Sequence, residues 1–158
     1  MQIRPITMED DAAMAQIVRT NLRKVGLDIP GTAYFDPCLD HLSRFCASRS
    51  GRGYYVMTDE DGTVVGGVGF AEYPDRENCA ELQKLYLTDE VKGRGYGYEL
   101  VVWVKTQAKA AGYRQMYLET HSVLKAAIHL YEKTGFREIP RPAGCVHSTM
   151  DRFFLTEL

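Results

Sequence analysis

The stretch Lys92-Gly93-Arg94-Gly95-Tyr96-Gly97 lies between an apolar segment that ends at Leu87 and a helical pattern of apolar residues that continues to about Ala111. Glycine has no side chain to block an approach, so several backbone N–H groups can converge on one anion. The first turn of a helix adds a partial positive charge, and Lys92 and Arg94 add two full charges. The stretch therefore predicts a diphosphate-binding turn at a helix start, with a turn that binds nothing as the alternative.

Two common phosphate-binding loops do not fit the spacing of this turn. A Walker loop needs Gly-Lys followed by Ser or Thr, whereas Gly95 and Gly97 are each followed by Tyr. A dinucleotide fingerprint would place its third glycine or alanine at position 98, which is Tyr98. The sequence thus favours a different class of phosphate-containing ligand.

The segments around the turn alternate between strand and helix patterns. Asp61-Gly62 predicts a hairpin turn, Thr7 with Asp10 predicts a capping box, and Asp36 with Pro37 predicts a second helix start. Strands are expected at 2–5, 54–58, 63–73, 79–87, 114–120 and 148–156, and helices at 7–26, 36–50, 97–111 and 123–134. This order predicts a mixed sheet with helices on its faces, in which a crossover aims the third helix at the end of a strand.

Composition narrows the class of protein. The chain has 158 residues and a formal net charge of −2, which indicates one domain over residues 1–158 and no nucleic-acid partner. It contains no apolar run of about 20 residues and no signal-peptide pattern, so we expect a soluble, cytoplasmic protein without membrane contact. Its four cysteines and four histidines are scattered, which predicts reduced thiols and no metal site.

With its flanking segments, the turn resembles the GNAT superfamily of acetyl-CoA-dependent N-acyltransferases. The family signature is Arg or Gln, two residues, Gly, one residue, then Gly or Ala; here Lys92 takes the place of Arg or Gln. Residues 80–87, AELQKLYL, resemble the family strand before the turn, and residues 124–136, LKAAIHLYEKTGF, resemble its second motif. Leu124 stands where the family often has Asn. The resemblance implies an α/β (α+β) fold with a mixed, largely antiparallel sheet of six to seven strands and about four helices.

The resemblance also implies a function and a set of site residues. It implies an N-acetyltransferase that moves the acetyl group of acetyl-CoA to a primary amine of a small molecule or peptide, by direct attack in a ternary complex. A non-catalytic acyl-CoA-binding or sensing module is the alternative. The residues it implies for binding acetyl-CoA are Leu85, Tyr86, Leu87, Lys92, Gly93, Arg94, Gly95, Tyr96, Gly97, Tyr98, Leu124 and Ala127.

The positions of several side chains on the expected helix and strands make them candidates for the proton donor and the general base. Tyr131 shares a helical face with Ala127 and Ile128, and the resemblance implies that it protonates the departing thiolate. Glu81, on the motif strand, is the first candidate for the general base. Glu119 and His121, at the end of the 114–120 strand, are rivals for that role, and a water chain is a further alternative. No cysteine is needed as a nucleophile.

The acceptor amine is not identified by any motif. We expect its specificity to lie in the first two helices, in the loop 26–35 and in the loop 140–147. Asp28, Asp36 and Asp40 could attract a cationic amine, although capping explains them as well. Phe153 and Phe154 on the last strand leave both a monomer and a homodimer open.

Overall fold

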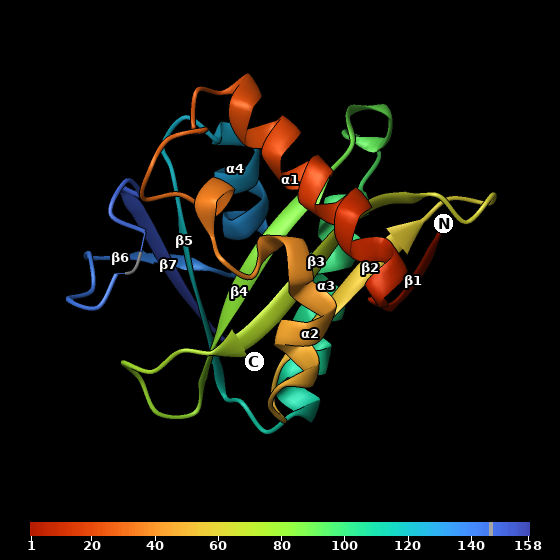
Figure 1. Cartoon of the computed structure of the whole chain (residues 1–158). Coiled ribbons are helices and arrows are strands. Elements are labelled where there is room, and N and C mark those ends of the chain that lie inside the picture. The colour runs from red at the N-terminus through yellow and green to blue at the C-terminus, as the bar shows by residue number, and fades with distance from the viewer. Residues whose placement is uncertain (146) are drawn as a thin grey trace.

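The computed structural model describes residues 1–145 and 147–158 and contains a seven-stranded sheet of order β1-β2-β3-β4-β5-β7-β6 (Figure 1). Its strands are β1 (Gln2–Pro5), β2 (Gly53–Thr58), β3 (Val64–Glu72), β4 (Cys79–Leu87), β5 (Gln115–Thr120), β6 (Arg137–Ile139) and β7 (Arg152–Glu157). The pair β4–β5 is parallel, and the other strand pairs among the described residues are antiparallel. The predicted fold class, a mixed and largely antiparallel sheet, is confirmed.

Helices cover both faces of the sheet. They are α1 (Asp11–Lys24), α2 (Leu42–Ala47), α3 (Tyr96–Ala110) and α4 (Lys125–Lys133), with 3-10 turns at Met8–Asp10, Ala33–Phe35, Leu39–His41 and Asp89–Val91. In Figure 1, α1 and α2 lie in front of the sheet and α3 lies behind it. Two apolar clusters match this arrangement, because α1 packs with Tyr54 and Val56 while α3 packs with Val68 and Leu118. Among the described residues, no helix combines the length and apolar character that a membrane span requires.

Local signals account for several element boundaries. The predicted capping box is present, since the Asp10 carboxylate accepts hydrogen bonds from the N–H and the hydroxyl of Thr7 at 2.8 and 2.9 Å. It starts a 3-10 turn that leads directly into α1. Gly62 closes the predicted hairpin turn with a φ of +83°. These features depend on residues within one turn of each other, so the sequence pattern is sufficient to predict them.

The second predicted helix is present but much shorter than the predicted range 36–50, and its predicted cap is wrong. Only Leu42–Ala47 is α-helical, and Asp36 caps no helix there. Its carboxylate turns inward to the Nζ atom of Lys84 at 2.7 Å and to Nε2 of His147 at 2.8 Å. Two partners from distant parts of the chain therefore replace the local capping role.

The C-terminal segment also differs from the prediction. The three-residue strand β6 was not predicted, because so short a run carries no periodic signal. The last strand begins at Arg152 rather than at residue 148, because Thr149 donates a hydrogen bond to the carbonyl of Pro30 and Asp151 accepts one from Ser122. Phe153 and Phe154 are buried in the protein, so neither supports a dimer surface.

Strands β4 and β5 separate after a short parallel contact. Their pairing ends at Glu81 opposite Tyr117, and Figure 1 shows the two strands diverging from there. The β3–β4 register shifts between Gly67 and Gly69, and Lys84 adopts a φ of +48° at this bulge. On its β5 side, the later part of β4 therefore has no strand partner among the described residues. Its free backbone groups border the opening between the strands.

Candidate active site

A cavity of about 1160 Å³ occupies the opening between β4 and β5. It is lined by parts of α1, the segment before α2, β4, the glycine turn, the end of β5, α4 and the loop before β7. The predicted site residues that line it are Glu81, Leu85, Tyr86, Leu87, Lys92, Gly93, Gly95, Gly97, Tyr98, Leu124, Ala127 and Tyr131. Arg94 and Tyr96 are not among its lining residues: Arg94 is exposed and Tyr96 packs against the core.

The glycine turn presents free donors at the start of α3. Gly93 and Gly95 have φ angles of +75° and +89°, and Gly95 is the N-cap residue of α3. The N–H groups of residues 93–97 take part in none of the hydrogen bonds among the described residues. A Cβ atom on Gly93 or Gly95 would meet no atom within 4 Å, so backbone conformation explains these two glycines. The turn can therefore hold an anion at the positive end of the helix.

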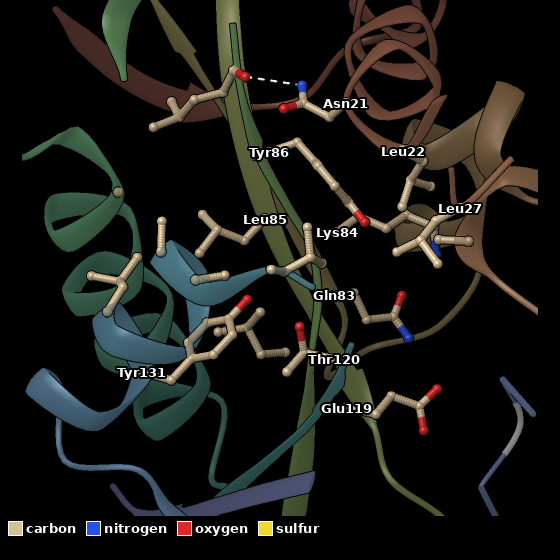
Figure 2. Close-up of a pocket in the computed structure, with 18 of the residues that line it drawn as sticks. Asn21, Leu22, Leu27, Gln83, Lys84, Leu85, Tyr86, Glu119, Thr120 and Tyr131 are labelled. Atoms are coloured by element: carbon tan, nitrogen blue, oxygen red, sulfur yellow. Dashed lines mark hydrogen bonds between the residues drawn. The ribbon is translucent and has the colours of Figure 1, made fainter. Parts of the chain in front are cut away.

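Gly97 has a different role, because a Cβ atom there would lie 3.1 Å from Cδ2 of Leu130. This glycine allows α3 and α4 to approach each other beside the turn. Lys92 donates hydrogen bonds to Oδ1 of Asp89 at 2.7 Å and to Oδ1 of Asn21, so part of its charge is already neutralised. Asn21, which the sequence analysis missed, also donates to the carbonyl of Leu87 at 3.0 Å (Figure 2). It thus links α1 to both β4 and the turn.

Tyr131 directs a free phenol into the cavity. Its ring is 6% exposed and packs edge-on against Phe136 at a centroid distance of 5.8 Å. Figure 2 shows its hydroxyl pointing into the opening toward Leu85. None of the hydrogen bonds among the described residues uses this hydroxyl, and burial raises the pKa of Tyr131 well above its usual value. The phenol therefore stays protonated at neutral pH and has a proton available to donate.

Glu81 is a half-buried carboxylic acid at the point where the strands separate. Its only hydrogen-bond partner among the described residues is the amide of Gln83, whose Nε2 donates to Oε2 at 3.4 Å. Burial, with the nearby negative charge of Glu119, raises the pKa of Glu81 to about 7. A carboxylate with this pKa can accept and release a proton at neutral pH.

Glu119 is held in its ionised form. Burial opposes its charge, but the hydrogen bonds from His147 and from the Cys145 thiol outweigh burial and lower its pKa. Its Oε2 accepts from the Tyr117 hydroxyl and the Cys145 thiol, both at 3.1 Å, and its Oε1 bonds with His147. Because its oxygens are occupied and its pKa is low, Glu119 is a weaker candidate base than Glu81.

His121 lies in the turn between β5 and α4, outside the cavity lining. Its Nδ1 accepts a hydrogen bond from the N–H of Val123 at 3.2 Å. His121 is therefore a weaker candidate for the general base than Glu81. In residues 1–145 and 147–158, no three His, Cys, Asp or Glu side chains are grouped so that they could hold a metal ion.

His147 and Asp36 complete the charged end of the cavity. For the site, the sequence indicated Asp36 only as one of three aspartates that could attract a cationic amine, and His147 only as part of the loop 140–147. His147 Nδ1 contacts Glu119 and its Nε2 lies 2.8 Å from Oδ1 of Asp36. Burial opposes the charge on His147, but the two carboxylates raise its pKa to about 10. Burial likewise opposes the charge on Asp36, and His147 and Lys84 bring its pKa to about 2. Val146, in the loop 140–147 expected to govern specificity, lies outside the described residues.

Comparisons with known proteins show the family and the fold of this chain. The model of the acetyltransferase (GNAT) family matches residues 17–136. The uncharacterised N-acetyltransferase YjgM of Escherichia coli K12 is 37% identical over 145 residues, covering 90% of this chain and 86% of its own. A GNAT acetyltransferase of Staphylococcus aureus Mu50 superposes with a TM-score of 0.86 at 19% identity, covering 99% of this chain and 98% of its own. A phosphinothricin acetyltransferase of Sinorhizobium meliloti, solved with acetyl-CoA, gives 0.77 at 22% identity, with 99% and 88% covered.

Proposed function

Because the chain belongs to the GNAT family of acetyltransferases, we propose that it moves the acetyl group of acetyl-CoA to a primary amine of a small molecule or a peptide. We propose direct attack of the amine while both substrates are bound. One observation carries the proposal: a single cavity joins the free N–H groups of the glycine turn to the phenol of Tyr131 and the carboxylate of Glu81. These are an anion-binding turn, a proton donor and a base.

The residues present fit acetyl-CoA. The unused N–H groups of residues 93–97 would hold its diphosphate, and the unpaired edge of β4 at Leu85–Leu87 would hydrogen-bond its pantetheine arm. When bound, acetyl-CoA supplies an activated acetyl thioester. Leu124 and Ala127 line the cavity on α4, on the same helical face as Tyr131, and would contact the arm from that side.

Glu81 is placed to remove a proton from the acceptor amine, which must be neutral before it can attack the thioester. An alkyl amine with a pKa of about 10.4 is neutral in only about one molecule in 2,500 at pH 7, a handicap of roughly 4.6 kcal/mol. A base with a pKa of about 7 takes a proton from the bound ammonium far more readily than an ordinary glutamate would. The raised pKa of Glu81 therefore supports its assignment as general base.

Tyr131 is placed to protonate the leaving group, the thiolate of coenzyme A. Its buried phenol is protonated at neutral pH, and its hydroxyl faces the same cavity without a hydrogen-bond partner among the described residues. It would donate its proton to the thiolate sulfur as the thioester bond breaks. Burial raises the pKa of the Cys79 and Cys145 thiols to about 11, so neither is a good thiolate nucleophile, which favours direct attack.

The proposal is tested by measuring thiol release from acetyl-CoA with a panel of primary amines, and by identifying the acetylated products by mass spectrometry. We expect amine-dependent release in the wild type. A Tyr113→Phe variant serves as the matched control for Tyr131→Phe, because the Tyr113 hydroxyl donates a hydrogen bond to the carbonyl of Gly51 outside the cavity. No amine-dependent release with any acceptor would contradict the proposed function.

A further inference from the structure

The cations beside Glu81 are already paired with carboxylates of the protein. Lys84 Nζ lies 2.7 Å from Oδ2 of Asp36, and the Lys84 side chain is only 5% exposed. His147 bridges Asp36 and Glu119 through its two ring nitrogens. Two positive and two negative charges thus cancel in this cluster. A substrate carboxylate entering here would meet no free cation in it.

Glu81 is the unbalanced charge at this end of the cavity. No Lys, Arg or His among the described residues forms an ion pair with it, and its hydrogen-bond partner is the neutral amide of Gln83. When Glu81 is ionised, the acceptor end of the cavity therefore has an excess of negative charge. An ammonium group is complementary to this charge, and a second substrate anion is repelled by it.

The walls around this end are mostly apolar. Figure 2 shows Tyr86 pointing from β4 toward Leu22 and Leu27, while Tyr131 and Leu85 lie on the other side of the strand. The apolar lining residues from α1, the segments that follow it and α2 are Leu22, Val25, Leu27, Ala33, Cys38 and Phe45. The hydroxyl of Tyr86 and the amide of Gln83 add neutral polar groups. Such walls favour an uncharged hydrocarbon or aromatic body.

We propose that the acceptor is a monoamine with an uncharged, largely apolar body, and that the Asp36–Lys84–His147–Glu119 cluster excludes amines that carry a carboxylate. This inference rests on the proposed function and narrows it to one class of acceptor. The ammonium group binds beside Glu81, and the body of the molecule lies against Tyr86 and the other apolar lining residues of the cavity.

The first test compares acceptors that differ only by a carboxylate. Phenethylamine is paired with phenylalanine and tyramine with tyrosine, and kcat/KM is measured for each at saturating acetyl-CoA. We expect the amine to be preferred by about tenfold or more. Equal or higher kcat/KM for the amino acids would overturn the inference while leaving the proposed function intact. Failure of all four compounds and of the broader amine panel would contradict the proposed function and this inference with it.

A series of linear alkylamines tests the apolar wall. From propylamine to hexylamine, we expect kcat/KM to rise about two- to fourfold for each methylene that the wall covers. The KM for acetyl-CoA should stay constant along the series. A flat series, or a falling one, would contradict an apolar acceptor site.

The Asp36→Asn variant tests the cluster itself. It removes the carboxylate that neutralises Lys84, so a free cation becomes available to a substrate carboxylate. We expect the preference for phenethylamine over phenylalanine to fall by about fivefold or more. The Asp40→Asn variant is the control, because Asp40 pairs with Arg19 and is not a lining residue of the cavity. An unchanged preference in an Asp36→Asn protein that melts cooperatively and keeps its KM for acetyl-CoA would overturn the inference.

Discussion

Replacement of Glu81 by glutamine should stabilise the protein and remove the group that we propose as the general base. The pKa of this carboxyl is about 7 in the folded protein, against 4.5 for an ordinary glutamate. The folded state therefore binds more protons than the unfolded state between about pH 4.5 and about pH 7, and stability falls as pH rises through this window. A difference of about 2.5 in pKa corresponds to about 3 kcal/mol above pH 7, reduced toward 2 kcal/mol because the side chain is only half-buried.

The assay is urea denaturation of the wild type and Glu81→Gln at about pH 5 and about pH 8. We expect the variant to gain about 2 kcal/mol in free energy of unfolding relative to the wild type at pH 8, and much less at pH 5. In the acetyl-transfer assay, the wild-type kcat/KM should fall about tenfold from pH 8 to pH 6. The variant depends on the small neutral fraction of the amine, so its kcat/KM should be lower and should fall more steeply over the same range. The Glu77→Gln variant, which changes an exposed glutamate, is the control.

Two results would refute this reasoning. If Glu81→Gln is equally stable or less stable than the wild type at pH 8, burial does not penalise the ionised form of Glu81. If the variant keeps the wild-type kcat/KM and its pH profile, another group is the general base. In that case Glu119, His121 or a water chain, the other candidates that the sequence left open, would have to be tested next.

Three further predictions concern the turn, the phenol and the charge cluster. Gly95→Glu should abolish acetyl-CoA binding measured by isothermal titration, because it places a carboxylate and a strained left-handed residue at the anion site; unchanged affinity would remove acetyl-CoA from this turn. Tyr131→Phe should lower kcat by about tenfold or more with little change in melting temperature, since its hydroxyl has no hydrogen-bond partner among the described residues; an unchanged kcat would exclude Tyr131 as the proton donor. His147→Gln should cost about 3 kcal/mol at pH 7 in urea denaturation. Because the pKa of His147 rises from 6.5 to about 10, the stabilisation that protonated His147 gives the folded state is fully present below about pH 6.5 and is lost as pH rises through 10. If the free energy of unfolding of the wild type did not fall over this alkaline range, the result would contradict the buried ion pairs of His147.

The sequence predicted correctly those features of the structure that depend on residues close together in the chain. The glycine turn, the capping box at Thr7 and the hairpin at Gly62 all lie where the pattern predicted them. Tyr131 also faces the cavity, because a helix places residues three and four apart on one face. In each case the decisive interactions span only a few residues, so backbone preference and periodicity are sufficient to predict them.

Contacts between residues far apart in the sequence decided the orientation of Asp36 and the environment of Glu81. Asp36 and His147 are 111 positions apart, and their contact, not a local cap, determines where the Asp36 side chain points. The same folding brings Glu119 near Glu81, and this charge together with burial raises the pKa of Glu81. No spacing in the sequence encodes these distances. The sequence by itself determined the fold class and the position of the glycine turn, and the tertiary structure decided which carboxylate is buried beside a second negative charge and so has a raised pKa.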